Sequence, residues 1–337
     1  MLLPFLHKIA AGEDLSASEA YSAMHAILSG EATTPQISAF LMGLRMKGET
    51  AEELLGFARA MRERTVRIDV CVAPEPLLDT CGAGGGAGST FNISTIAAFV
   101  VAGAGARVAK HGNRSFSSHC GSADVLEELG VEISQPPERV AQAIREIGIG
   151  FLFAPLLHPA MKHAQPARAD LKMRTVFNLL GPLTNPAGAT RQLIGAPSSH
   201  AAELMANALA GLGPERAFVV HGEGLDEITT SGTTMVFEIA GSQVRSFKWA
   251  PADFGIQPTE VSELRGGDRT RNAEIAKRVL QGEQGPRRDV VLINSAAALI
   301  VAGISDSPLD ALQRAAASID SGAAWQKLRQ LAEFSRG

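Results

Sequence analysis

The sequence predicts an α/β protein with an N-terminal helical domain and a larger α/β domain built on a mostly parallel sheet. The first 64 residues show only helical spacing of apolar side chains, whereas short apolar strands alternate with helices from Pro74 onward. A length of 337 residues favours about two domains. With 45% hydrophobic and 20% charged residues, the chain can bury a sizeable core, which argues against intrinsic disorder.

Charge and cysteine content argue against several classes of protein. The formal net charge is −4 and the pI is near 6.1, so bulk attraction to nucleic acid or anionic lipid is absent. The three cysteines form no Cys-x-x-Cys pair, and neither a disulfide framework nor a zinc site follows. His7 and Lys8 interrupt the first apolar run, and the stretch Ile96–Ala106 is too short to span a bilayer. We therefore expect a cytoplasmic protein without nucleic-acid or membrane partners.

The N-terminal helices carry start and stop signals. Ser16–Glu19 and Thr50–Glu53 are capping-box patterns, in which a hydroxyl and a carboxylate each bind a free N–H group. Thr34–Pro35 supplies an N-cap and a first-turn proline for a helix between them. Gly30 and Gly48 stand where the first two of these helices should end. The sequence therefore predicts three helices between about residues 16 and 64.

The α/β domain begins after these helices. The predicted strands are Leu77–Thr80, Arg107–Lys110, Val131–Ile133, Gly150–Phe153, Gln192–Ile194 and Ala217–His221. A helix from about Ser94 to Gly103 separates the first two, as in a βαβ unit. The segment Thr229–Trp249 should be extended, and two or three helices after Asn272 should close the chain.

The segment Pro159–Leu180 interrupts this alternation with a second helical pattern. We expect it to pack back on the N-terminal helices. The predicted helical domain is therefore residues 1–70 joined by helices from about 159–185, and the α/β domain is residues 74–158 and 190–337.

A glycine-rich segment, residues 82–88, follows the first predicted strand and contains five glycines in seven positions. Such a loop, leading into a helix N-terminus, directs backbone N–H groups at an anion such as phosphate, although a flexible loop without a ligand is the alternative. The next strand ends in Lys110–His111, where an NAD site would need an acidic residue. No lysine follows the glycines, which excludes an ATP-hydrolysing P-loop.

The segment Lys110–Ser118 combines two permanent cations, a histidine, an amide and three hydroxyls. Individually, Lys110 and Arg114 could be surface residues and His111 a structural histidine. Together they indicate an anion site, because the carboxyl ends of neighbouring parallel strands meet at one edge of the sheet. We therefore expect this segment and the glycine-rich loop to face one ligand.

Four motifs in order resemble the anthranilate phosphoribosyltransferase family. They are GAGGGAGSTFNIST (82–95), KHGNRSFSSHCGSAD (110–124), FNLLGPLTNP (177–186) and GLDE (224–227), and the similarity runs over residues 3–334. The resemblance implies a fold of the nucleoside phosphorylase/phosphoribosyltransferase type and a homodimer. It also implies transfer of the phosphoribosyl group from phosphoribosyl pyrophosphate to the amine of anthranilate, with Mg²⁺, in tryptophan biosynthesis.

The resemblance also implies residues for the donor and the metal. The donor-binding positions are Gly82, Gly85, Gly86, Thr90, Asn92, Ile93, Ser94, Thr95, Lys110, Asn113, Ser117, Ser118 and Ser122. The positions for Mg²⁺, of which the resemblance implies two ions with the donor, are Ser94, Asp226 and Glu227. Carboxylates with water and substrate phosphates are the oxygen ligands that Mg²⁺ prefers.

For anthranilate, the resemblance implies a pocket made of Gly82, His111, Asn113 and Arg168. The guanidinium of Arg168 suits the planar carboxylate, whereas the nearby Arg174 receives no role. Lys110, Arg168 and His111 are the expected catalytic residues. His111 could accept a proton, although an orienting role is favoured. The two substrates should meet between the domains.

The glycine-rich loop departs from the family pattern. Ala83 and Gly86 replace the usual Thr and Asp, which removes contacts to the donor and a negative charge beside the pyrophosphate. Two alternatives remain. A pyrimidine nucleoside phosphorylase-like enzyme would have different motifs and no use for Arg168. A non-catalytic nucleic-acid-binding relative should be basic and lack the Asp226–Glu227 pair.

Overall fold

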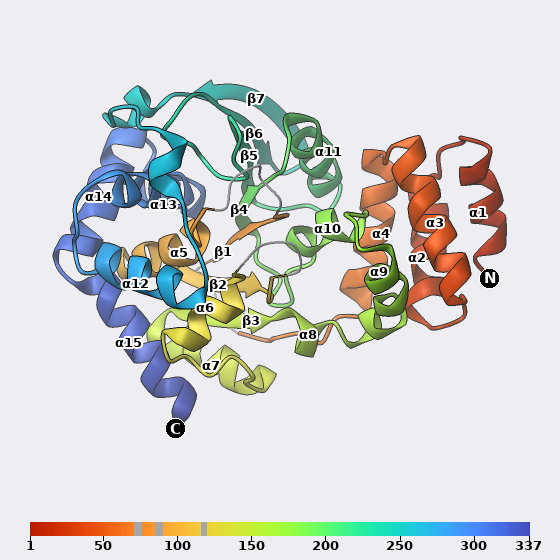
Figure 1. Cartoon of the computed structure of the whole chain (residues 1–337), viewed down its shortest axis with the longest axis horizontal. Helices are drawn as coiled ribbons and strands as arrows, with labels where there is room; N and C mark the ends of the chain where they lie inside the picture. Colours follow the sequence, from red (N-terminus) through yellow and green to blue (C-terminus); the bar gives the residue numbers. More distant parts are fainter. Residues whose placement is uncertain (71–75, 85–89, 116–119) are drawn as a thin grey trace.

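The computed structural model describes the chain except residues 71–75, 85–89 and 116–119. A helical part lies beside a larger α/β part, with the N-terminus at the far end of the helical part (Figure 1). Four helices open the chain: α1 (Leu3–Ala10), α2 (Ala17–Leu28), α3 (Thr34–Lys47) and α4 (Ala51–Glu63). The sequence signals found the last three of them and not α1.

Both predicted capping boxes are confirmed. The N–H of Glu19 donates to Ser16 Oγ at 3.3 Å, and the Ser16 N–H donates back to Glu19 Oε2 at 2.9 Å. Thr50 and Glu53 form the same pair of bonds at the start of α4. The N-cap of α3 is Thr33 rather than Thr34. These helices therefore begin where local side chains satisfy the free N–H groups.

The sheet has seven strands in the order β3-β2-β1-β4-β5-β6-β7. They are β1 (Leu77–Gly82), β2 (Arg107–Gly112), β3 (Ile149–Phe153), β4 (Arg191–Gly195), β5 (Arg216–Gly222), β6 (Thr234–Ala240) and β7 (Gln243–Trp249). The first five are parallel, and β6 and β7 pair antiparallel, which confirms a mostly parallel sheet.

The strand predicted at Val131–Ile133 is wrong. Both side chains are buried in the core, but the backbone there belongs to no strand. Two apolar residues, one on either side of Glu132, fit a buried loop as well as a strand, and so short a segment does not distinguish the two.

The helices of the α/β part follow the strands. They are α5 (Ile93–Gly103), α6 (Ser122–Glu128), α7 (Pro137–Ile147), α8 (Ala154–Leu157), α11 (Ser199–Ala210), α12 (Arg269–Leu280), α13 (Pro286–Ala302), α14 (Pro308–Asp320) and α15 (Ala323–Arg336). Helix α12 contains Asn272, and α13, α14 and α15 begin after it, which agrees with the two or three helices predicted there.

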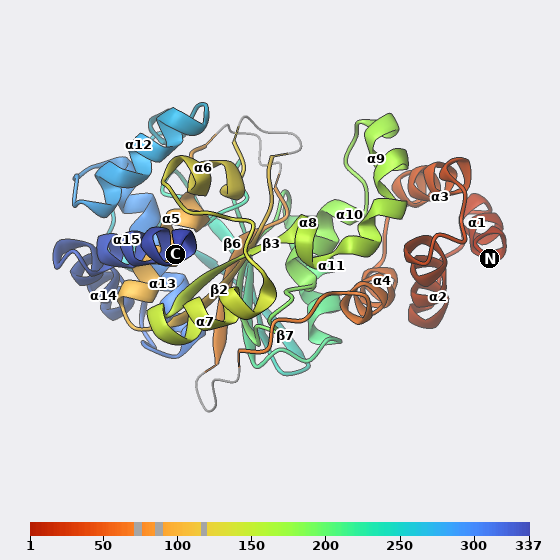
Figure 2. The same cartoon turned by 90° about the horizontal axis from the view of Figure 1, so that it is seen from below.

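Both faces of the sheet are covered, as alternate residues of β5 show. Phe218 and Val220 pack in a core with α5 and α13, whereas Ala217 and Val219 pack in a second core with α11. Helices α5 and α11 lie on opposite faces because right-handed crossovers leave β1 and β4 in opposite directions. Figure 2 shows the sheet between these two layers.

The segment from residue 159 onward returns to the N-terminal helices, as predicted. The 3₁₀ helix η1 (Pro159–His163), α9 (Gln165–Leu171) and α10 (Phe177–Leu180) contact α2, α3 and α4, respectively. We call residues 159–185 the helical excursion. Its connections are bonded to the segment after α4, because Val66 N–H donates to Leu157 O at 2.9 Å and Ile68 N–H to Pro186 O at 3.1 Å. The boundaries between the two domains stay a prediction.

Candidate active site

The order of strands reverses at β1, with β2 and β3 on one side and β4 and β5 on the other. In open α/β sheets, ligands bind at such a switch point, outside the carboxyl ends of the strands. The predicted glycine-rich loop leaves β1 at this edge, and the Lys110 segment leaves β2 beside it. In the described residues, the two segments therefore meet at one edge, as expected.

Two glycines allow the Asp226–Glu227 turn to lie directly over this edge. A Cβ on Gly195 would lie 1.7 Å from the carbonyl oxygen of Asp226, and one on Gly222 would lie 2.6 Å from that of Glu227. Both distances are too short for any side chain. The carboxylate of Asp226 lies close to Gly82 as well. The ends of β1, β4 and β5 therefore fix the position of the two acidic residues.

The three predicted metal residues lie together. Ser94 stands in the first turn of α5, and its N–H donates to Glu227 Oε1 at 3.3 Å. Desolvation of the carboxyl group, followed by the charge of Asp226, raises the pKa of Glu227 to about 8. A bound cation would offset both effects. The donor set of two carboxylates and a hydroxyl fits Mg²⁺.

No cluster of three or more His, Cys, Asp or Glu residues that could hold a metal occurs in the described ranges. A cation beside Asp226 and Glu227 would therefore need further ligands from substrate or water, which is the usual situation for Mg²⁺ and unusual for zinc.

Lys110 lies inside the sheet edge and does not project from it. Its side chain is buried, and Nζ donates to Thr80 O at 2.5 Å. Burial lowers the pKa of Lys110, while the negative charges of Asp79 and Glu227 act in the opposite direction. This places one positive charge between β1 and the acidic turn.

Asp79 and Asn185 are two site residues that sequence reasoning missed. Asp79 is fully buried and accepts the His111 backbone N–H at 3.1 Å and Asn185 Nδ2 at 2.8 Å. Burial raises the pKa of Asp79. The available signal was a carboxylate inside an apolar strand, which needs partners when buried. These contacts tie the FNLLGPLTNP motif to the ends of β1 and β2.

After β2, the predicted residues Asn113 and Ser122 contact each other, whereas Arg114 turns toward α6. Asn113 N–H donates to Ser122 Oγ, which in turn donates to Asn113 O, each at 3.2 Å. Arg114 forms ion pairs with Asp124 and Glu127 on α6, so the expected anion role of its charge is wrong. Ser117 and Ser118 lie outside the described residues.

Most of the predicted donor-binding residues near α5 are buried or already contact other residues of the protein. Asn92 Nδ2 donates to Cys120 O, and Asn272 Nδ2 donates to Asn92 Oδ1. Ile93 and Thr95 have buried side chains, and Thr90 forms a β-bridge with Arg265. Gly85 and Gly86 lie outside the described residues. A donor-binding role for this group therefore stays a prediction.

Two arginines of the helical excursion differ in what they contact. The guanidinium carbon of Arg168 lies 5.3 Å from the centre of the Phe177 ring, and burial lowers its pKa. Arg174 reaches the glycine-rich loop, because its Nη2 donates to Ala83 O at 3.1 Å. Its Nη1 is buried and has no hydrogen-bond partner in the described part of the chain. Arg174, for which no role was predicted, therefore contacts the glycine-rich loop that is expected to bind the donor.

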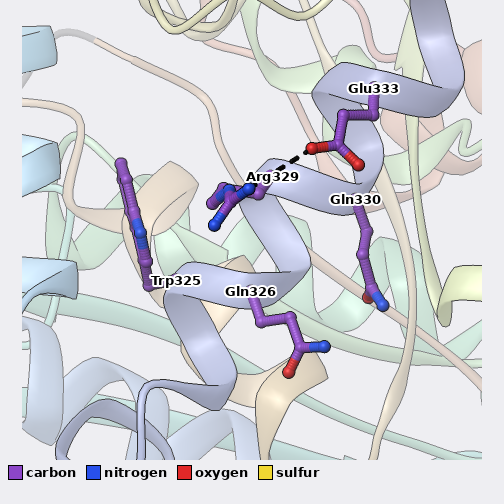
Figure 3. Close-up of a pocket in the computed structure, with 5 residues that line it drawn as sticks. All are labelled: Trp325, Gln326, Arg329, Gln330 and Glu333. Atoms are coloured by element: carbon purple, nitrogen blue, oxygen red, sulfur yellow. Dashed lines mark ion pairs between the residues drawn. The ribbon is translucent and has the colours of Figure 1, made fainter.

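A surface pocket elsewhere contains none of these residues. It lies along α15 and is lined by Trp325, Gln326, Arg329, Gln330 and Glu333 (Figure 3). Arg329 and Glu333 form an ion pair across one helical turn at 3.5 Å. A pocket of this kind on one exposed helix has no connection to the sheet edge.

Comparisons with known proteins agree with this geometry. The model of the glycosyl transferase family, a/b domain, matches residues 74–325, and that of its helical bundle domain matches residues 3–65. Anthranilate phosphoribosyltransferase of Solibacter usitatus is 59% identical, covering 99% of this chain and 98% of its own. The chain belongs to the anthranilate phosphoribosyltransferase family.

Solved structures of anthranilate phosphoribosyltransferases also match. The enzyme from Thermus thermophilus has a TM-score of 0.92 at 43% identity, covering 98% of this chain and 99% of that one. The enzyme from Saccharomyces cerevisiae, in complex with phosphoribosyl pyrophosphate and Mg, has a TM-score of 0.91 at 29% identity, covering 99% and 98%. The nucleoside phosphorylase and nucleic-acid-binding alternatives are not favoured.

In this member of the anthranilate phosphoribosyltransferase family, the glycine-rich loop has an alanine at position 83. Ala83 has no side-chain hydroxyl, and its carbonyl oxygen accepts a hydrogen bond from Arg174. The backbone at this position therefore has a fixed contact with the excursion. In the described residues, every helix is too short or too polar to cross a membrane.

Proposed function

We propose that this protein transfers the phosphoribosyl group of phosphoribosyl pyrophosphate to the amine of anthranilate, in tryptophan biosynthesis. The products are N-(5-phosphoribosyl)anthranilate and pyrophosphate. The observation that carries the proposal is the meeting of Gly82, Ser94, Lys110, Asp226 and Glu227 at one sheet edge, in a chain of this family.

The reaction breaks the bond between ribose C1 and the pyrophosphate oxygen and forms a bond from C1 to the anthranilate nitrogen. Negative charge grows on the leaving pyrophosphate. The positive end of helix α5 and the charge of Lys110 would stabilise this negative charge. Mg²⁺, when bound, supplies further positive charge, and Ser94, Asp226 and Glu227 would hold it.

The acceptor amine is neutral at pH 7 and attacks without prior deprotonation. Its orientation should therefore matter more than a strong base. Arg168 would bind the anthranilate carboxylate with a bidentate pair of N–H groups. Both ring nitrogens of His111 already have partners, which supports an orienting role for that residue. The proton of the amine leaves after the new bond forms.

The enzyme would act as a homodimer in the cytoplasm. Met1, just before α1, Leu3 in α1 and Met46 in α3 expose apolar side chains that a second copy could cover. Cys81 and Cys120 are free thiols, as expected in a reducing compartment, and Cys71 lies outside the described residues.

An assay of anthranilate fluorescence tests the proposal. Anthranilate should disappear only when both phosphoribosyl pyrophosphate and Mg²⁺ are present, with pyrophosphate released in equal amount. Phosphorolysis of uridine or thymidine in place of this reaction would support the nucleoside phosphorylase alternative. Retention on DNA at physiological salt, with no turnover, would support the nucleic-acid-binding alternative.

A further inference from the structure

His111 and His158 form a buried pair with hydrogen-bonding groups on both sides. Their Nε2 atoms are 3.1 Å apart, and His111 Nδ1 lies 3.2 Å from Gly181 O. On the other side, His158 Nδ1 lies 3.1 Å from Thr65 Oγ1, which is 2.8 Å from Met61 O. The four contacts form one continuous chain from the excursion to helix α4.

The members of this chain come from the segments that connect the two parts of the molecule. Thr65 follows α4, His158 precedes the helical excursion, and Gly181 lies near the end of it. His111 is the penultimate residue of the parallel strand β2, and its backbone N–H donates to Asp79. This series of hydrogen bonds therefore links all three connecting segments to the sheet edge.

A count of hydrogen atoms sets the direction of these bonds. Burial lowers the pKa of His111 to about 3 and that of His158 to about 4, so both rings are neutral at pH 7. Each neutral ring supplies one N–H and Thr65 supplies one O–H, which makes three donors for four contacts. One contact must remain without a hydrogen.

The shortage falls at Thr65, because its single hydroxyl hydrogen can rotate and is shared between Met61 O at 2.8 Å and His158 Nδ1 at 3.1 Å. Met61 O already accepts the Arg64 N–H at 3.1 Å, so it loses little. A gap at the paired Nε2 atoms would set two lone pairs against each other, and a gap at His111 Nδ1 would set its lone pair against Gly181 O. Both are costly inside the protein.

The donors therefore run in one direction along the chain. Thr65 O–H donates to His158 Nδ1, His158 Nε2–H donates to His111 Nε2, and His111 Nδ1–H donates to Gly181 O. Each ring is thereby held as a single tautomer.

We propose that His158 and Thr65 are positioning residues that hold His111 as its Nδ1–H tautomer, with its ring fixed on Gly181. In this arrangement, His111 has no free lone pair with which to accept the proton of the amine. Its role is to keep the excursion, which carries Arg168, in place against the sheet edge. This consequence for the acceptor rests on the proposed function, whereas the tautomer does not.

The tautomers can be measured directly in protein labelled with ¹⁵N-histidine. Long-range ¹H–¹⁵N correlation spectra at pH 7 should show His111 protonated at Nδ1 and His158 protonated at Nε2. The signals would be assigned with H111Q and H158Q variants. A His111 ring protonated at Nε2, or one that averages between tautomers, would overturn the proposal whatever the enzymatic activity is.

Variants at position 158 test the consequence for the reaction. H158L removes the donor to His111 Nε2 and should lower kcat/KM for anthranilate about tenfold, which corresponds to about 1.4 kcal/mol. The KM for phosphoribosyl pyrophosphate should not change. H158Q carries an amide N–H close to the place of Nε2 and should stay within about threefold of wild type, given the usual worth of one hydrogen bond.

Variants of Thr65 and of a second histidine, His163, complete the experiment. T65V should lower kcat/KM for anthranilate by about threefold, and T65S should restore it, because only the hydroxyl is required. The matched control is H163Q, since His163 lies in η1 and contacts Gly30 instead of His111. Wild-type values for H158L, or equal losses in H158L and H158Q, would contradict the proposal. An enzyme inactive with anthranilate in every form would refute the proposed function alone.

Discussion

At the sheet edge, Lys110 and Asp79 are held on strands that pair with neighbours on both sides, whereas Arg168 stands on a seven-residue helix of the excursion. We call the first region the donor side and the second the acceptor side. The donor side takes its positions from the sheet and from two close glycine contacts. The acceptor side depends on contacts among the connecting segments.

This difference separates the residues that supply charge near the donor from the residue expected to orient anthranilate. The buried ionisable groups Asp79, Lys110 and Glu227 are held by the strands and the turn beside them, so changes there should affect the chemical step. The helix that carries Arg168 can lose a contact without disturbing strand pairing, so changes there should affect anthranilate binding. Variants on each side test this division.

The largest effect is expected on the donor side, from replacement of Lys110. K110M keeps the length of the side chain and removes its charge, and kcat should fall by about 10²–10³-fold, with little change in the KM for anthranilate. Asp79 and Glu227 lose their positive partner, so the melting temperature should fall as well. Steady-state kinetics and thermal unfolding measure the two effects. Near-normal turnover would contradict the assignment of Lys110.

A change that leaves every charge in place should also disrupt the donor side. G195A puts a methyl group 1.7 Å from Asp226 O, so the acidic turn must move away from β4. Displacement by about 1 Å can cost about 10²-fold in rate. Activity should fall by that order, and more Mg²⁺ should be needed for half-maximal rate. A variant with wild-type Mg²⁺ dependence would show that the turn does not hold the metal.

Much of the donor side follows from local sequence. The glycine-rich loop, Ser94 and the Asp226–Glu227 pair are recognisable because each signal is contained in a few residues. The capping boxes of α2 and α4 are predictable for the same reason. The fold class follows from the alternation of strands and helices.

The remaining features depend on contacts between distant residues. Asp79 meets Asn185 across 106 positions, and His111 meets His158 across 47. Arg114 forms ion pairs with two acidic residues of α6, so the expectation that its charge is free for an anion was wrong. No local pattern shows such partners, because only the order of the strands and the path of the excursion bring them together.

The two arginines of the excursion give a matched pair with smaller effects. R168Q should raise the KM for anthranilate about tenfold or more and leave that for phosphoribosyl pyrophosphate unchanged, because a charge-assisted bidentate contact is lost. R174Q should do the reverse by a few fold, since Arg174 contacts Ala83 of the glycine-rich loop.

Initial rates measured with each substrate varied in turn distinguish these outcomes. The lysine variants R168K and R174K serve as controls, because they keep the charge and lose the planar geometry. If both glutamine variants raised the same KM, the separation into a donor side and an acceptor side would fail.

The last effect should appear in stability rather than in rate. The folded-state pKa of His158 is lowered by burial to about 4, below an ordinary value of 6.5. Between these values the unfolded chain binds more protons than the folded one, so stability is lost as the pH falls from about 6.5 toward 4. From pH 7 to pH 5, this ring should cost about 2 kcal/mol.

Urea unfolding of wild type and H158Q at both pH values measures the contribution of His158. Other titrating groups, such as Glu227 with its raised pKa, are present in both proteins and largely cancel in the difference. Wild type should lose more stability on acidification than H158Q, by about the amount given above for one ring. Equal losses in the two proteins would mean that His158 binds a proton as readily in the folded protein as in the unfolded chain. In that case, the contacts between the connecting segments would not require His158 to be neutral, contrary to the hydrogen-bond directions inferred above.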